Sequence, residues 1–326
     1  MAKDGSVNEL LLFLLSKKGI YVSGEELSEK FGVSRTAIWK QINRLRELGY
    51  EIDSVPRVGY CLKKSPDLLL PEEIVQNGPF EFLASKIYHY TSIGSTNDEA
   101  KKLAQMGAPH GTLVIAEEQT GGRGRLGRKW VSPPGQGIWL SIILRPSLEP
   151  SEAPRITMAC AVAAAKAIRQ EVGVNCLIKW PNDLLIDGKK VAGILTEMSA
   201  DMDKIHYVVT GIGMNVNNAE FPPDIEKTAT SLKLASGEEV ERLKILTQFL
   251  SQFEEIYRSL EGGKFEAILG EWRQLSCNLG KRVRIIGRNF ELEGTALDVD
   301  GDGALLIKTD EGQVERVLSG DVSLRE

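Results

Sequence analysis

The chain has 326 residues, a length that indicates two or three domains, and its 42% apolar and 26% charged residues are typical of a globular protein with a sizeable core. No apolar run reaches the roughly 18 residues of a membrane-spanning helix, so we expect no membrane contact. Its four cysteines form no CxxC pair or Cys/His cluster, so we expect a cytoplasmic protein with buried thiols in a reducing cytosol and no structural zinc.

The net charge of −5 is unevenly distributed along the chain. Residues 1–64 hold eleven Lys and Arg against eight Asp and Glu, whereas the remainder holds 29 against 37. A basic segment joined to a larger acidic one indicates a local contact with nucleic acid, although the excess of positive charge is small.

The first elements predicted are two short helices. Ser23 to Glu26 read as a capping box that starts one helix, and Phe31 to Ser34 read as a tight turn whose serine caps a second helix. In that second helix Ile38, Ile42 and Leu45 fall on one buried stripe. Helix, glycine-containing turn and helix with a basic outer face are typical of a helix-turn-helix domain.

A β-hairpin is expected next, because residues 50–55 and 58–62 alternate in polarity around a turn at Pro56-Arg57. Such a hairpin would be the wing of a winged helix-turn-helix, which favours DNA binding over a three-helix module with a solvated charged face. The candidate DNA-binding residues are Ser34, Arg35, Thr36, Lys40, Arg44 and Arg57, while Asn43 also lies off the buried stripe. Pro66 and Pro71 lie in a segment, residues 65–85, that we predict to be a linker.

Beyond residue 85 the chain is predicted to form a mixed α+β sheet, because short strands follow one another with few helices between them. One Ala-rich segment, 153–172, is expected to be a long buried helix. Neither a Walker A loop nor a GxGxxG turn after a strand occurs, so a nucleotide would bind without the usual phosphate cradle. The predicted strands are 113–116, 138–144, 177–180, 184–186, 191–197 and 205–213.

The segment Gly121–Trp130, GGRGRLGRKW, combines four glycines with four basic residues and no acid. Glycines let backbone amides approach a ligand closely, and arginines supply fixed, multi-donor positive charge. One interpretation is a lid that orders over a phosphate or carboxylate. An RGG-like nucleic-acid tether and a merely mobile loop are equally compatible with the composition.

From residue 281 onward, four short alternating segments separated by glycine turns predict a small β-barrel. Within it, Asp298 to Gly303 resembles the start of an EF-hand loop, but the twelfth position is Thr309 rather than a bidentate Glu. We therefore predict a hairpin turn there. The four segments are 281–286, 290–297, 304–308 and 314–318.

Five motifs together resemble the biotin–protein ligase family, in that family's order. The winged helix-turn-helix at the start is similar to the subclass that is both ligase and biotin-operon repressor. The motifs are Ser95–Asn97 (STN), Gly121–Trp130 with Gln119 (the biotin-binding loop), Lys179–Leu184 (KWPNDL), Lys189–Leu195 (KKVAGIL) and Gly211–Asn217 (GIGMNVN).

This resemblance implies the fold class, α+β, with three domains. They are a winged helix-turn-helix, residues 1–64, a central mixed ligase domain of the class II synthetase and biotin–lipoate ligase type, 86–272, and an SH3-like small β-barrel, 273–326; residues 65–85 form the linker.

It also implies an activity. Biotin would be activated with ATP and Mg²⁺ to biotinyl-5′-AMP, and the biotinyl group would pass to a lysine of a biotin carboxyl carrier protein, such as that of acetyl-CoA carboxylase. The adenylate-bound protein would be a homodimer that binds operator DNA.

Residue roles follow from the same resemblance. Lys190 would hold the biotin carboxylate and the α-phosphate, and Arg123 and Arg125 would lie over the adenylate. The implied biotin site comprises Ser95, Thr96, Asn97, Gln119, Arg123, Gly124, Arg125, Lys190 and Gly193; the adenylate residues are Lys190, Arg125 and Arg128; the ATP and metal residues are Asn182, Asp183 and Asn215.

The adenine contact and two alternative functions are left open. Residues 219–232 contain no Trp to stack on adenine and resemble the shorter Gram-positive form, so the adenine contact is unassigned. A lipoate–protein ligase shares the expected central architecture, but the arginine-rich loop and the DNA-binding domain argue against it. A repressor without catalysis is the other alternative, and Lys190, Asn182 and Asp183 argue against that one. No Ser/His/Asp or Cys/His constellation occurs, and the three histidines are interpreted as structural.

Overall fold

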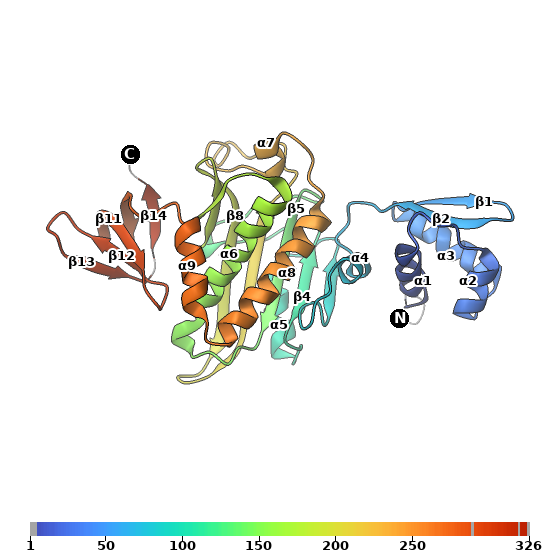
Figure 1. The fold of residues 1–326 in the computed structure, drawn as a ribbon, viewed down its shortest axis with the longest axis horizontal. Coiled ribbons are helices and arrows are strands. Elements are labelled where there is room, and N and C mark those ends of the chain that lie inside the picture. Colours follow the sequence, from blue (N-terminus) through green and yellow to red (C-terminus); the bar gives the residue numbers. More distant parts are fainter. Residues whose placement is uncertain (1–4, 288–289, 319, 325–326) are drawn as a thin grey trace. The chain divides into compact units, whose positions relative to one another are not determined.

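The computed structural model describes residues 5–287, 290–318 and 320–324. The chain divides into two compact units, Met1–Pro79 and Phe80–Glu326. Figure 1 shows their elements, and each unit is described by itself. Within the described ranges, no helix combines the length and the apolar character needed to cross a membrane.

The first unit is the predicted winged helix-turn-helix. The side chain of Ser23 accepts a hydrogen bond from the amide of Glu26 and that of Ser34 from the amide of Ala37, so both predicted helix starts are confirmed. Ile38, Ile42 and Leu45 are fully buried against Leu10 and Leu27. Its elements are α1 (Gly5–Ser16), α2 (Gly24–Phe31), α3 (Arg35–Glu47), the antiparallel wing strands β1 (Glu51–Val55) and β2 (Gly59–Lys64), and α4 (Pro71–Asn77).

The segment interpreted as a linker contains α4. Pro71 stands in the first turn of this helix, where its missing N–H costs no hydrogen bond, and Ile74 is buried. Helix α4 contacts α1, so residues 71–77 belong to the first unit. The proline predicted to lie in a linker is therefore a helix start.

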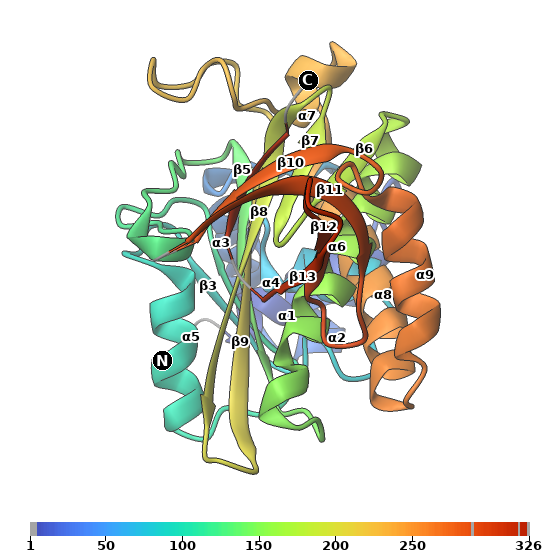
Figure 2. The same ribbon diagram turned by 90° about the vertical axis from the view of Figure 1, so that its left-hand side faces the viewer.

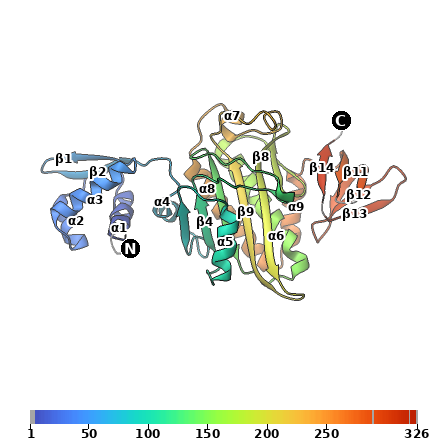
Figure 3. The same cartoon turned by 180° about the vertical axis from the view of Figure 1, so that it is seen from behind.

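The second unit is built on a seven-stranded sheet in the order β3-β4-β5-β9-β8-β7-β6. Only β3 and β4 pair in parallel; the other neighbours are antiparallel, so the predicted mixed sheet is confirmed. The long strands β8 and β9 lie side by side in Figures 2 and 3. The strands are β3 (Ile87–Tyr90), β4 (Thr112–Ala116), β5 (Gly137–Leu144), β6 (Cys176–Lys179), β7 (Asp183–Ile186), β8 (Lys189–Ala200) and β9 (Ile205–Asn215).

Helices cover both faces of this sheet. Helix α6 (Ala153–Val172) has the bounds predicted from its alanines, with Pro154 in its first turn and Gly173 in the left-handed conformation at its end. It packs with α8 (Arg242–Glu261) and α9 (Phe265–Leu275) on one face, and α5 (Thr96–Gln105) lies on the other (Figures 1 and 3). A short helix, α7 (Leu232–Ser236), precedes α8.

The C-terminal strands form a separate antiparallel sheet in the order β13-β12-β11-β10-β14. Strand β14 was not predicted, and α9 runs through the boundary expected at 272. The predicted hairpin turn is confirmed, because Asp300 accepts hydrogen bonds from the amides of Asp302 and Ala304 at 2.9 and 3.0 Å. The strands are β10 (Arg282–Ile286), β11 (Glu291–Val299), β12 (Leu305–Lys308), β13 (Val314–Val317) and β14 (Asp321–Leu324).

This small sheet contacts the central domain through polar bonds. The indole Nε1 of Trp180 donates to the carbonyl of Gly303 at 3.0 Å, and the backbone amide of Trp180 donates to Asn278 Oδ1 at 2.7 Å. Arg155 donates to the carbonyl of Gly301 at 2.8 Å. The KWPNDL segment therefore lies against the C-terminal sheet.

Candidate active site

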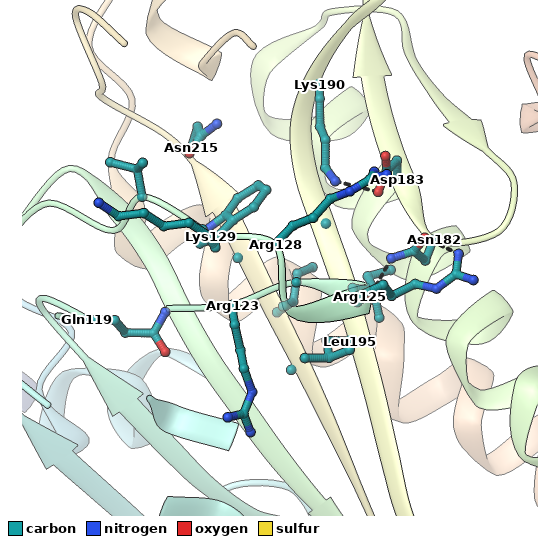
Figure 4. A pocket seen from close by; sticks show the side chains of 18 of the residues that line it. Gln119, Arg123, Arg125, Arg128, Lys129, Asn182, Asp183, Lys190, Leu195 and Asn215 are labelled. Atoms are coloured by element: carbon teal, nitrogen blue, oxygen red, sulfur yellow. Dashed lines mark hydrogen bonds and ion pairs between the residues drawn. The ribbon is translucent and has the colours of Figure 1, made fainter. Parts of the chain in front are cut away.

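A cavity of about 210 Å³ lies over β5, β8 and β9, and Figure 4 shows it from close by. It brings together every residue that the sequence analysis assigned to biotin, adenylate or ATP–metal binding. These are Ser95, Thr96, Asn97, Gln119, Arg123, Gly124, Arg125, Arg128, Asn182, Asp183, Lys190, Gly193 and Asn215.

The STN motif starts α5 and is tied to neighbouring strands by its side chains. Gln119 Oε1 accepts hydrogen bonds from the amide and hydroxyl of Thr96 at 2.9 and 3.1 Å. The Ser141 hydroxyl lies 2.8 Å from Thr96 Oγ1 and 2.6 Å from Asn97 Oδ1. Because all three motif residues are buried, the polar wall of the cavity is held rigidly before any ligand binds.

Two glycines of the GIGMNVN motif are required by close approach. A Cβ atom on Gly211 would lie 2.0 Å from Asn97 Oδ1, and one on Gly213 would lie 2.4 Å from Trp130 Nε1. Neither distance leaves room for a methyl group. Strand β9 can therefore lie directly beneath the STN motif and the indole of Trp130 only because these positions lack side chains.

The glycine- and arginine-rich loop folds back on itself. The amide of Gly124 donates to the carbonyl of Arg128 at 2.7 Å, and the amide of Trp130 donates to the carbonyl of Gly122 at 2.9 Å. Residues Arg125–Gly127 form a single 3₁₀ turn at the tip, where Leu126 adopts a positive φ of 56°. The segment is thus an ordered hairpin beside the cavity, with its basic side chains distributed around it.

Lys190 lies at the centre of the charged side of the cavity. Its Nζ is 2.6 Å from Asp183 Oδ1 and 5.3 Å from the centroid of the Trp130 ring. Its backbone pairs with the segment after β9, because its amide donates to the carbonyl of Thr228 at 2.7 Å. This pairing fixes the lysine between the loop and the segment that follows GIGMNVN.

Asn182 and Asn215 are both held in place by backbone groups. Asn182 Nδ2 donates to the carbonyl of Ile194 at 2.6 Å and Asn215 Nδ2 to that of Thr230 at 3.1 Å. Arg125 donates to Asn182 Oδ1 at 3.2 Å and to the carbonyl of Gly320 at 3.4 Å. The loop arginine therefore joins the KWPNDL segment to the C-terminal sheet.

A second cavity of about 610 Å³ adjoins the first. The two share Arg125, Asn182, Ile194 and Leu195 among their lining residues. Its remaining walls come from the start of α6, from Trp180 and from the C-terminal sheet. The charged cavity is therefore bordered by a more open space between the central domain and the small sheet.

Asp183 is the acid that the described structure offers to a magnesium ion in the cavity. No group of three His, Cys, Asp or Glu that could hold a metal ion occurs among the described residues. A single carboxylate fits Mg²⁺ that arrives with a nucleotide, because this ion keeps waters and phosphate oxygens as most of its ligands.

Two of the three histidines, His89 and His110, have structural surroundings, while His206 lies at the surface 3.0 Å from Asp201. His89 lies 3.1 Å from the buried Glu117, which also pairs with the fully buried Arg242 at 2.9 Å. Burial lowers the pKa of His110, whose Nδ1 accepts a hydrogen bond from the amide of Arg145. The four cysteines are buried free thiols, and burial raises the pKa of Cys176 to about 12. None of these groups is a poised nucleophile.

The candidate DNA-binding residues lie on the first unit, on α3 and the wing. Arg35 forms an exposed ion pair with Glu25 at 3.0 Å, and Arg57 occupies the turn between β1 and β2 with a positive φ of 66°. The hydroxyl of Ser34 is used for capping α3. Thr36, Lys40 and Arg44 are exposed along the same helix.

Several cavity residues had been given no role by the sequence analysis. Trp130 packs over Gly193 and Gly213, and the segment after β9 contributes Phe221, Ile225 and Thr228. Trp130 could have been singled out as the large apolar residue of a loop that is otherwise Gly, Arg and Lys. Nothing in the pattern of residues 219–232 indicated that it folds back over the cavity.

Comparisons with known protein families agree with this geometry. Residues 90–215 match the biotin/lipoate A/B protein ligase family, residues 7–61 an HTH domain, and residues 279–325 the biotin protein ligase C-terminal domain. The fold and the cavity thus define a protein ligase of the biotin and lipoate type that carries a helix-turn-helix domain.

Relatives along the whole chain narrow this class. The bifunctional ligase/repressor BirA of Bacillus spizizenii is 41% identical over 96% of this chain and 97% of its own length. That of Escherichia coli is 30% identical over 99% of this chain and 98% of its own. The biotin protein ligase of Aquifex aeolicus in complex with biotin and ATP superposes with a TM-score of 0.65 at 30% identity, covering 74% of this chain and 99% of that one. The chain belongs to the bifunctional biotin ligase/repressor family, and the expected resemblance and fold class are confirmed.

Proposed function

We propose that this protein activates biotin with ATP to biotinyl-5′-AMP, transfers the biotinyl group to a lysine of a carrier domain, and represses transcription when the adenylate is bound. The observation that carries the proposal is the cavity in which Lys190, Asp183, Asn182 and the arginine loop converge, in a chain that also holds a winged helix-turn-helix.

In the first reaction a carboxylate oxygen of biotin attacks the α-phosphorus of ATP. A new P–O bond forms, the bond to the bridging oxygen of the β-phosphate breaks, and pyrophosphate leaves. Two anions must meet, so fixed cations lower the barrier by offsetting their repulsion and the developing charge. Lys190 is the cation best placed to hold the carboxylate against the phosphate, because strand pairing fixes its backbone on both sides.

The other cavity residues would position the two substrates. The buried STN motif and Gln119 present fixed polar atoms to the biotin head group, and Trp130 forms an apolar wall beside them. Asn182, Asp183 and Asn215 would hold the nucleotide end, where Mg²⁺ supplies charge neutralisation for the phosphates. Arg125 and Arg128 would close over the adenylate from the loop.

In the second reaction the carrier lysine, as the free amine, attacks the acyl carbon of the adenylate. An amide bond forms, AMP leaves, and a proton is lost from the amine. The anhydride is already activated, so this step needs positioning and exclusion of water rather than an enzyme nucleophile. That agrees with the buried, unreactive state of the cysteines.

Pyrophosphate exchange tests the activity. Labelled pyrophosphate should enter ATP only when biotin is present, and mass spectrometry should show one biotinyl group on a purified carrier domain. Exchange supported by lipoate but not by biotin would instead assign the protein to the lipoate ligases.

Repression is proposed to depend on dimerisation. One winged helix offers few phosphate contacts, whereas a two-fold dimer doubles them and reads a palindromic operator. The four free thiols are compatible with a protein of the reducing cytoplasm, which is also the compartment of operator DNA. Operator binding should therefore tighten when biotin and ATP are added at fixed salt. Equal affinity with and without them would contradict the coupling.

A further inference from the structure

Four charged side chains meet on the outer side of the loop, next to the start of α5. Asp98 and Lys101 come from α5, Arg123 from the loop and Glu197 from β8. Arg123 pairs with Asp98 and lies 3.8 Å from Glu197, and Lys101 lies 3.1 Å from Asp98 and 2.9 Å from Glu197. Two acids and two bases thus form a closed group, the ion-pair cluster.

The cluster turns Arg123 away from the charged end of the cavity. In Figure 4 the Arg123 guanidinium points away from Lys190, Asp183 and Asn182, whereas Arg128 extends toward Asp183. Arg123 also lies at the base of the loop hairpin, where it forms an isolated β-bridge with Lys129, and Gly121 just before it donates to the carbonyl of Gly94 at 2.8 Å. An ion pair at this point restrains the base of the loop rather than its tip.

The acids of the cluster are themselves held firmly. Asp98 stands in the first turn of α5, whose N-cap is Ser95, and Glu197 accepts a hydrogen bond from Asn97 Nδ2 at 2.9 Å. Burial disfavours the charge on Asp98, but hydrogen bonds from Lys101 and Arg123 outweigh this and lower its pKa. The carboxylate is therefore ionised at neutral pH and fixed to the same motif that forms the polar wall of the cavity.

We propose that Asp98, with Glu197, is a positioning residue that holds the glycine- and arginine-rich loop in its folded hairpin through Arg123. Arg123 is then an anchor of the loop and not a ligand of the adenylate, and Arg125 and Arg128 are left to close the cavity. The consequence for catalysis rests on the proposed function: without the anchor the adenylate leaves faster.

Limited proteolysis of the ligand-free full chain tests the anchor without any biotin chemistry. Asp98→Asn removes the charge that holds Arg123, so trypsin should cleave after Arg125, Arg128 and Lys129 roughly two- to fivefold faster, the range expected for a partly exposed ion pair. Glu99→Gln is the matched control. It removes the same charge from the same helix turn, but Glu99 pairs with Lys102 at 3.3 Å and not with the loop.

The second measurement is the rate of biotinyl-5′-AMP release from Asp98→Asn, Arg123→Gln and the double variant. The anchor predicts that each single change speeds release by a similar two- to fivefold and that the double variant is no faster, because both changes remove one interaction. Glu99→Gln should release the adenylate at the wild-type rate.

Three results would overturn the proposal. They are loop cleavage in Asp98→Asn at the wild-type rate, an equal acceleration in Glu99→Gln, and release from the double variant at the product of the two single effects, which would make Arg123 a direct adenylate contact. If no variant, nor the wild type, forms adenylate, the proposed function fails while the proteolysis still decides whether the anchor exists.

Discussion

Replacing Gly213 by Ala should weaken biotin binding by displacing Trp130. The added Cβ would lie 2.4 Å from Trp130 Nε1 and 2.6 Å from its Cε2, and 3.1 Å from Cδ1. Strand β9 is paired on both sides, with β5 and with β8, so it cannot move to relieve the overlap. The half-buried indole can move outward, and it then no longer forms the wall of the cavity.

The size of the effect follows from the cost of overpacking. An extra methyl group in a well-packed site costs about 1–3 kcal/mol, and here the strain is avoided only by moving the indole from its position at the wall of the cavity. Biotin should therefore bind roughly five- to a hundredfold more weakly, at about 1.4 kcal/mol per decade. Thermal stability should change little, since the strain disappears once Trp130 has moved.

Gly193→Ala is the matched control on the neighbouring strand. Its Cβ would lie 3.1 Å from Lys190 Cε and 3.4 Å from the edge of the same indole, so it meets the flexible end of a lysine. Calorimetric titration with biotin should show a smaller loss for this variant than for Gly213→Ala. Wild-type affinity in Gly213→Ala, or a greater loss in Gly193→Ala, would refute the reasoning from close approach.

Three further changes have defined outcomes. Arg125→Gly removes the side chain that contacts Asn182 and the carbonyl of Gly320. Each charge-assisted contact contributes about 1.5–3 kcal/mol, so the variant should release the adenylate roughly ten- to a hundredfold faster, and the released adenylate should biotinylate lysines of albumin. An unchanged off-rate would contradict this. Arg242→Met leaves the buried Glu117 without its guanidinium partner, so the free energy of unfolding measured in urea should fall by about 3–5 kcal/mol. Lys244→Met breaks the exposed ion pair with Glu241 and should lower the same free energy by less than about 1 kcal/mol. Arg35→Ala with Arg44→Ala should weaken operator binding in a mobility-shift titration and leave ligation intact, and a parallel loss of ligation would show that the change disturbs more than the DNA-binding surface.

Much of the local structure could be predicted from the sequence because it depends on neighbouring residues. Ser23 and Ser34 cap their helices through hydrogen bonds that span three positions, and the alanines of α6 determine a helix with the predicted bounds. Helix α8 also has a readable pattern, with Ile245, Phe249, Phe253 and Tyr257 at four-residue steps on its buried side. This periodicity is typical of a helix with one buried face.

The pairing of charges could not be predicted in the same way. The motifs identified which side chains meet in the cavity, but Arg123, Lys101, Asp98 and Glu197 come from three elements that are distant in the sequence. Which acid a given arginine meets depends on the register of β8 and on the direction in which the loop leaves β4. The same holds for Arg242, a charge at a helix start that is fully buried because Glu117 and the carbonyl of Gly137 face it.

The pairing also explains how the protein's own side chains order so basic a loop. Arg123 has Asp98 as its partner, Arg125 donates to Asn182 Oδ1 at 3.2 Å, and Lys190 Nζ lies 2.6 Å from Asp183 Oδ1. These cations therefore have polar partners within the protein itself. A phosphate or carboxylate that enters the cavity must replace some of these contacts, and the free energy it gains is the difference between the new contact and the old one. Tight retention of the adenylate then requires that several contacts within the protein are replaced by contacts to the adenylate at the same time. Only a loop held at its base keeps its cations placed for this.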